Sequence, residues 1–84
     1  MTPDTHLVVV AVYDTPKAFA RAAAPSGAAL AAILQVAPRT ARCYRAGERT
    51  MPVDAMQAVL DARGDGCRAA VVCGAVVVVR EVEA

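Results

Sequence analysis

The segment LAAILQVAPRTARCYRAGERTMP, residues 30–52, constrains the fold of this chain more than any other. It begins with an apolar helical turn and runs into a short break at residues 35–37. Pro38 suits the first position of a new helix, because its missing N–H would have no helical partner there. Gly47 suits the end of that helix, because glycine readily adopts the left-handed conformation of a C-cap. The segment therefore predicts two short helices joined by a tight turn.

The second of these helices is strongly basic. Residues 36–50 contain four arginines and one acid, so the local charge is four minus one, +3, although the whole chain carries only +1. The arginines are Arg39, Arg42, Arg45 and Arg49. Arginine without lysine favours bidentate recognition of phosphate or carboxylate over general solubility. Two short helices with a tight turn and a basic second helix have the form of a helix-turn-helix, whose second helix enters the DNA major groove.

Composition predicts that residues 1–84 form one small domain with a core of small side chains. Hydrophobic residues make up 57% of the chain, yet aromatic residues make up only 4%. Residues 6–13 have the apolar pattern of a buried strand, and residues 67–73 and 75–82 that of two strands joined at Gly74. We expect an α+β fold of order β-α-α-α-α-β-β, with a helix-turn-helix helical core and a small antiparallel three-stranded sheet.

Capping residues and prolines predict where the four helices begin. Asp14 or Thr15 caps a first helix that starts at Pro16 and stops near Pro25. Ser26 caps a second helix that extends through residue 34. Pro38 opens the third helix, and Pro52 opens a fourth that ends at Gly64. The residues expected to point into the core from these helices are Phe19, Ala22, Ala23, Leu30, Ile33, Leu34, Val53, Met56, Val59 and Leu60, together with Met51.

The four consecutive valines at residues 76–79 predict a strand that is covered on both faces, because they show no polar alternation. Four short helices are too few to cover both faces of a sheet. We therefore expect one face of the C-terminal strand, or its edge, to be buried between the two subunits of a homodimer.

Several residues of the basic segment match a known phage pattern. The short stretch L-G-V-S-P-R-T-V-R-R-W-x-x-G-E-R-x-I-P links the second and third helices of some phage and prophage proteins. The matching residues here are Pro38, Arg39, Thr40, Arg42, Gly47, Glu48, Arg49 and Pro52. On these residues, the region 28–60 resembles the helix-turn-helix of the Cro/cI repressor class. It departs from the pattern at Gln35 in place of the turn glycine, at Ala37 in place of the capping serine, and at Ala41 in place of a β-branched residue.

The resemblance implies a set of contact residues. Those implied to face the major groove are Ala37, Pro38, Arg39, Arg42 and Cys43. Those implied to reach phosphates are Thr40, Arg45 and Arg49. An arginine at position 39 has the donors to bind O6 and N7 of a guanine, whereas phosphate contacts position a protein without reading sequence.

The resulting prediction is a small regulator of transcription, of phage or mobile-element type, that binds double-stranded DNA as a homodimer in the cytoplasm. A second hypothesis is a phage-encoded inhibitor of the anti-CRISPR type, which binds a CRISPR effector (surveillance) complex and blocks its binding of target DNA. For that hypothesis the arginines contact protein or compete for a nucleic-acid path. A third alternative is that the arginines form a solvated helix face.

Other residue types give no sign of catalysis or of a bound cofactor. Cys43, Cys67 and Cys73 are odd in number and lack a C-x-x-C spacing, so we expect buried thiols and neither a zinc site nor a disulfide. His6 and Ser26 are the only residues of their types and lie in no catalytic motif. We expect no enzyme activity, no catalytic residue, no metal, no cofactor and no small-molecule substrate. No signal peptide or membrane-spanning segment is predicted.

Overall fold

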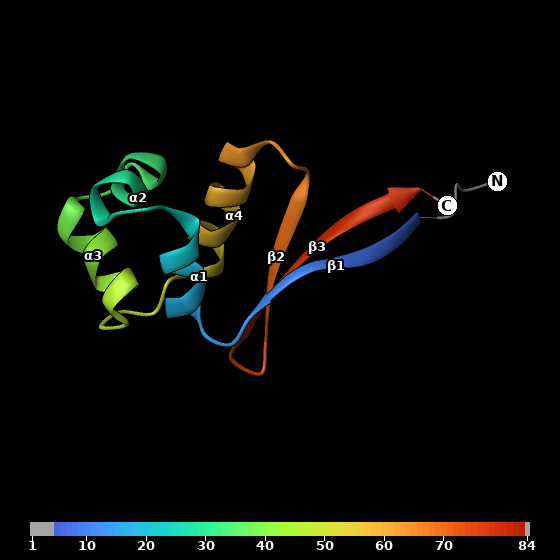
Figure 1. Cartoon of the computed structure of the whole chain (residues 1–84), viewed down its shortest axis with the longest axis horizontal. Helices are drawn as coiled ribbons and strands as arrows, with labels where there is room; N and C mark the ends of the chain where they lie inside the picture. The colour runs from blue at the N-terminus through green and yellow to red at the C-terminus, as the bar shows by residue number, and fades with distance from the viewer. Residues whose placement is uncertain (1–4, 84) are drawn as a thin grey trace.

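The computed structural model describes residues 5–83, in which four helices gather at one end of a three-stranded antiparallel sheet (Figure 1). The elements in chain order are β1 (Thr5–Tyr13), α1 (Pro16–Ala23), α2 (Gly27–Leu34), α3 (Pro38–Ala46), α4 (Val53–Arg63), β2 (Cys67–Val72) and β3 (Ala75–Glu83). This order confirms the predicted α+β class, and each element lies within two residues of its expected bounds.

The predicted capping residues act as expected. The Thr15 hydroxyl accepts a hydrogen bond from the N–H of Ala18 at 3.1 Å and so begins α1. The Ser26 hydroxyl accepts from the N–H of Ala29 at the same distance and begins α2. Gly47 ends α3 in the left-handed region at a φ of 78°, where an L side chain would be strained. Local sequence therefore determines most helix boundaries.

β3 is the central strand of the sheet, whose order is β1-β3-β2. A two-residue turn at Cys73 and Gly74 joins β2 to β3, and both residues have a positive φ, 52° and 81°, as a type I′ hairpin turn requires. Since residues 76–80 of β3 pair on both sides, this part of the strand, which includes the valine run, has no edge open to another subunit. The expectation that the edge of the C-terminal strand lies between subunits is therefore wrong, whereas its face stays a candidate.

The two faces of the sheet are covered differently. On β3, Val76 and Val78 face the helices and are 0% and 4% exposed, whereas Val77 and Val79 are half-buried on the opposite side. We call this opposite side the open face. Its apolar residues, from the strand register, are Leu7, Val9, Val12, Ala70, Val72, Ala75, Val77 and Val79. Among the described residues, no helix covers this face, as expected from four short helices, and its cover by a second subunit stays a prediction.

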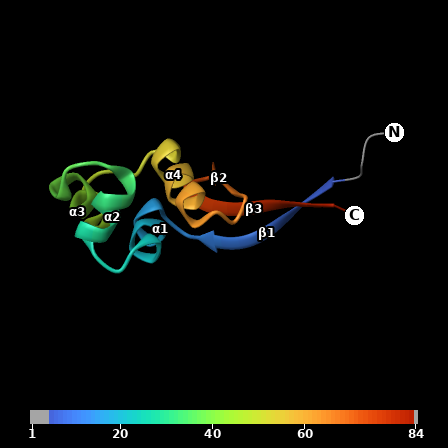
Figure 2. The ribbon, with the colours of Figure 1, turned by 90° about the horizontal axis from the view of Figure 1, so that it is seen from above.

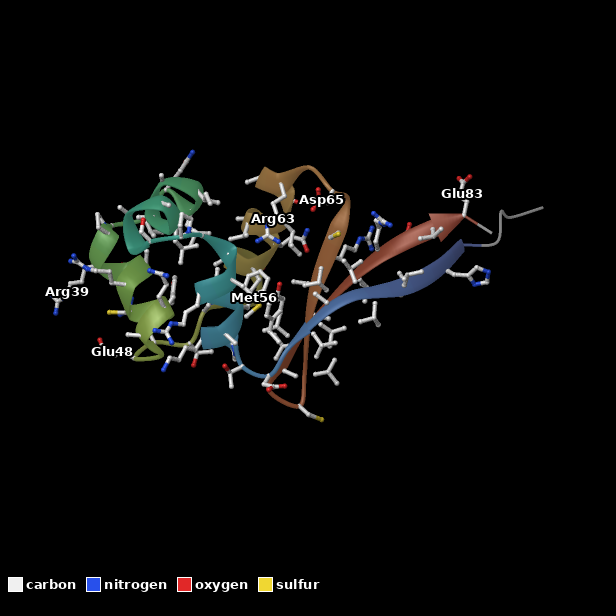
Figure 3. All side chains as sticks on the ribbon, viewed as in Figure 1. Arg39, Glu48, Met56, Arg63, Asp65 and Glu83 are labelled. Atoms are coloured by element: carbon white, nitrogen blue, oxygen red, sulfur yellow. The ribbon has the colours of Figure 1, made fainter. Side chains whose placement is uncertain are left out.

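The core lies between the helices and the covered face of the sheet. Its largest fully buried side chains are Phe19, Leu30, Met51, Met56, Leu60, Val59 and Val76, and Met56 lies at its centre in Figure 3. The ring of Phe19 meets that of Tyr13 edge to face, with centroids 5.4 Å apart. Two predicted core residues are exposed instead, Ala22 on α1 and Val53 at the first position of α4; Ala20 takes the place of Ala22.

The prediction of buried thiols is correct only for Cys67. Cys43 is half-buried and Cys73 is exposed in the β2–β3 turn, and all three thiols are free. The physical reason lies in the turn itself. A type I′ turn leaves its two central residues at the tip of the hairpin, where no other element covers them.

Gln57 ties α4 to the edge strand β2. Its carboxamide donates to the carbonyl of Cys67 at 3.0 Å and accepts from the N–H of Ala69 at 3.1 Å. It also donates to the carboxylate of Asp61 at 3.0 Å. The side chain of Gln57 is partly buried and pairs with β2 as the backbone of a further strand would.

The molecule is longer than a compact domain of this size. Its radius of gyration is 13.7 Å, compared with about 12 Å for a globular domain of this length. The excess comes from β1 and β3, whose far ends extend together beyond the helices as a two-stranded ribbon (Figures 1 and 2). The helices cover only the half of the sheet near β2.

Candidate nucleic-acid interface

α2 and α3 form the end of the molecule farthest from the ribbon (Figure 2). We call residues 27–46 the α2–α3 unit. The two helices approach closely at Gly27, where a Cβ atom would lie 2.7 Å from Cγ of Arg42. The aliphatic part of Arg42 therefore packs on the first turn of α2, in space that only glycine leaves free. The residues around Gly27 in the sequence do not signal this contact, because Arg42 is 15 positions away.

The turn between the two helices keeps a left-handed residue without glycine. Gln35 has φ 57° and ψ 44°, and its N–H donates to the carbonyl of Ala31. The N–H of Val36 donates to the same carbonyl at 3.2 Å. A left-handed non-glycine residue costs about 1 kcal/mol, so the departure from glycine keeps the turn geometry at some expense of stability. At Ala37 no side chain caps α3, as its loss of serine predicts.

α3 has a buried side and an exposed side. Ala41 and Tyr44 are buried, at 0% and 8% exposed, and hold α3 against the other helices. Pro38, Arg39 and Arg42 lie on the exposed side. In Figure 3 the side chain of Arg39 points away from the molecule at its extreme end. This spacing gives the helix a basic outer surface with a firmly packed base.

The guanidinium groups of Arg39 and Arg42 have no partner within residues 5–83. Neither group donates a hydrogen bond within these residues. The one ion pair among them joins Arg68 to Glu81 on the sheet, at 4.0 Å. Five N–H donors per guanidinium are thus left for water or a ligand. Because an ordinary solvated arginine has the same freedom, the informative feature is that both lie on one face of one short helix.

Two expected contact residues take part in the fold instead. Arg45 turns back to donate to the carbonyl of Pro25 at 3.5 Å, and its buried Nε has no partner within the described residues. The thiol of Cys43 donates to the carboxylate of Glu48 at 3.6 Å and is half-buried. The structure therefore leaves Arg45 and Cys43 less accessible to a ligand than Arg39 and Arg42.

Arg49 lies apart from the outer face of α3, at a cavity of about 490 Å³. The cavity lies between the start of α1, the segment after α3 and the β2–β3 hairpin. Its lining residues are Thr15, Pro16, Lys17, Gly47, Arg49, Thr50, Val71 and Gly74. Lys17 packs its aliphatic part on Gly47, where a Cβ would lie 2.9 Å from Lys17 Cδ. Lys17 was not predicted from the sequence, because nothing in its local pattern signals that it lines the same cavity as Arg49.

The remaining predicted contact, Thr40, is half-buried near the start of α3, and its N–H donates to the carbonyl of Ala37 at 3.0 Å. No group of His, Cys, Asp and Glu residues between positions 5 and 83 has the arrangement of a metal site. Within the same range, every helix falls short of the length and apolar character that crossing a bilayer requires.

No family model, curated protein or solved structure matches this chain. The geometry and charge of the α2–α3 unit and its surroundings are therefore the features that bear on function.

Proposed function

We propose that this protein binds double-stranded DNA as a dimer and regulates transcription in the cytoplasm, as a product of phage or mobile-element type. The observation that carries the proposal is the pair Arg39 and Arg42. Their guanidinium groups are exposed on one face of a helix that follows a tight turn, and neither meets a carboxylate within residues 5–83. A helix of this kind fits the major groove.

Arg39 and Arg42 pack differently on the rest of the protein, and this difference suggests different roles in DNA binding. Arg39 lies in the first turn of α3 with an exposed side chain, and the planar guanidinium fork suits the O6 and N7 atoms of guanine. Arg42 is held at its base by Gly27, which limits the positions that its guanidinium can reach. A side chain that is fixed in this way loses less conformational entropy on binding.

Arg49 and Lys17 are suited to phosphates. They lie near the end of α3, at the cavity that also presents the hydroxyl residues Thr15 and Thr50. Two cations beside two hydroxyl groups match the contacts that proteins make to the DNA backbone. Such contacts fix the orientation of a protein on the duplex but carry no sequence information. Lys17 thus joins the residues that sequence analysis proposed.

The salt dependence of binding tests the proposal. A dimer that neutralises about four to eight phosphates gives a log–log slope of affinity against salt of roughly −4 to −7. We expect this slope by fluorescence anisotropy with a random-sequence duplex between about 50 and 200 mM salt. Substitution of both Arg39 and Arg42 by alanine should weaken binding strongly, whereas the matched change Arg68→Ala on the sheet should have little effect.

Absence of duplex binding at low salt, or an affinity that does not change with salt, would exclude this function. The arginines of α3 would then form a surface for an acidic protein or a ribonucleoprotein. The anti-CRISPR type of inhibitor would become the better hypothesis. It is tested by adding the protein to a CRISPR surveillance complex and measuring whether target DNA is still captured.

A further inference from the structure

β1 exposes more apolar surface than a strand of a monomeric protein ordinarily does. Leu7, Val8, Val9, Val10 and Val12 are all large aliphatic residues, and each is between 44% and 65% exposed. They lie on both faces of the strand, because β1 and β3 extend beyond the helices as a ribbon (Figure 1). Contiguous exposed apolar surface of this kind marks an interaction site or an aggregation liability.

β1 is also an unprotected edge. It pairs with β3 on one side only, and every second residue of a strand directs its N–H and C=O groups to the other side. Within residues 5–83, no hydrogen bond apart from the ladder to β3 involves β1. The strand contains no lysine, glutamate or proline, which are the residues that usually blunt an edge.

The other edge of the sheet is protected. Gln57 occupies the carbonyl of Cys67 and the N–H of Ala69, so the first half of β2 cannot accept a strand without losing these bonds. β2 also carries Arg68, whose charged side chain pairs with Glu81. The two edges of one sheet therefore differ: one is closed by a side chain and a charge, and one is open, uncharged and apolar.

We infer that β1 pairs in antiparallel orientation with β1 of a second copy, so that two three-stranded sheets become one sheet of six strands. This inference specifies the interface of the dimer in the proposed function. Its test uses no DNA, so failure of the interface and failure of DNA binding are distinguishable.

The composition of β1 favours a second copy of this chain as the partner at its open edge. An edge strand whose middle is uncharged and aliphatic pairs favourably with a strand of the same composition and length. The β1 strand of a second copy, Thr5–Tyr13, is such a strand. Pairing of β1 with the β2 edge of another copy would produce an open-ended chain of molecules, but Gln57 closes that edge. Pairing of β1 with β1 uses the same patch twice and closes after two copies.

The accessible surface of the chain exceeds that of a compact monomer by roughly the area that one partner buries in a stable dimer. The accessible surface is 5404 Å², about 700 Å² above the roughly 4,700 Å² of a compact monomer of this mass. A stable interface buries about 800 Å² on each partner. Antiparallel pairing also keeps the helices of both copies on the same face of the sheet. The helices of one copy then lie on the side where Val8 and Val82 of the other are exposed.

The experiment compares lysine substitutions on the two edge strands by light scattering of the full chain at about 100 µM, well above the Kd of a stable interface. The wild-type protein should have twice the chain mass of 8.7 kDa. Val9→Lys should give a folded monomer, because it places like charges close together across the pair of β1 strands. Val72→Lys is the matched control: Val72 is similarly exposed, at 54% against 57%, and lies on the open face of the other edge strand. It should stay dimeric.

A charge-reversal arm identifies the partner as a second copy. Val9→Glu alone should also be monomeric, and an equal mixture of Val9→Lys and Val9→Glu should recover the dimer mass. Circular dichroism checks folding of each variant. Amide hydrogen exchange on the wild-type protein gives a readout that needs no substitution: β1 amides should exchange more slowly as the protein concentration rises.

Any of the following results would contradict pairing of β1 with β1. A wild-type monomer at about 100 µM excludes the interface. Loss of the dimer in both Val9→Lys and Val72→Lys means that the open faces stack on each other instead. Retention of the dimer in both, or β1 exchange that is independent of concentration, places the interface elsewhere. If Val9→Lys does not fold, Leu7→Lys takes its place, because Leu7 is 65% exposed near the end of the strand.

Discussion

The aliphatic part of Arg42 occupies the space that a side chain at Gly27 would need. A Cβ at Gly27 would lie 2.7 Å from Arg42 Cγ but 3.7 Å from Arg42 Cα, so the side chain and not the backbone makes the close approach. The crossing of α2 and α3 thus depends on a glycine in one helix and a long side chain in the other. This contact links the packing of the α2–α3 unit to the position of a candidate DNA-binding arginine.

Gly27→Ala should destabilise the wild-type protein by about 1–3 kcal/mol, the usual effect of overpacking. In an Arg42→Ala background the obstructing atoms are gone, and alanine is a better helix former than glycine by up to about 1 kcal/mol. The same substitution should then be neutral or slightly stabilising. Urea denaturation of the four proteins measures the coupling. An equal loss in both backgrounds would show that Arg42 is not the obstacle.

Gln57→Ala should lower the free energy of unfolding by about 1–3 kcal/mol, because it leaves the Cys67 carbonyl and the Ala69 N–H without partners. It should also cause aggregation that increases with protein concentration, because it opens the β2 edge. Asp61→Ala is the control, since it removes only an exposed bond to the same carboxamide. Denaturation and light scattering measure both effects. Similar results for the two variants would contradict the protective role of Gln57.

Local signals in the sequence predicted the elements of this fold well. Thr15, Ser26 and Gly47 each act within one helical turn of their own position, so their neighbours in the chain determine their roles. The hairpin at Cys73 and Gly74 is likewise a local feature. Such signals locate helices and turns without any knowledge of the tertiary structure.

Contacts between residues far apart in the chain could not be predicted from local sequence patterns. The run of valines in β3 predicted a strand covered on both faces, but no local pattern shows which face the helices cover. The structure places Val76 and Val78 against the helices and leaves Val77 and Val79 on the other side. In the candidate site, the pattern marked Arg39 and Arg42 correctly as exposed residues of α3. It did not reveal that Arg45 reaches the carbonyl of Pro25, or that Lys17 and Arg49 line one cavity. Each of these relationships joins residues that are at least 20 positions apart.

Val78→Glu and Val79→Glu should have opposite consequences for folding. Val78 is 4% exposed on the helix side, so a carboxylate there is buried without a partner and should unfold the domain. Val79 lies on the open face, so its substitution should cost about 1 kcal/mol or less. Circular dichroism and thermal unfolding separate the two. Equal destabilisation would mean that another layer covers the open face, as stacked sheets of two copies would.

Arg39→Ala and Lys17→Ala should weaken DNA binding in different ways. If Arg39 reads a guanine, its loss costs about 1–3 kcal/mol on the preferred site and relaxes the preference at one base pair. If Lys17 and Arg49 hold phosphates, Lys17→Ala weakens all duplexes about equally and makes the salt slope of the dimer shallower by about 2, roughly 1 for each subunit. Preferred sites come first from selection in a random duplex library, and anisotropy then compares selected with scrambled duplexes. Arg68→Ala serves as the control for net charge, because it removes one cation from the sheet, where its pair with Glu81 is exposed. Equal effects of Arg39→Ala on selected and scrambled duplexes would reduce α3 to an electrostatic contact without sequence readout.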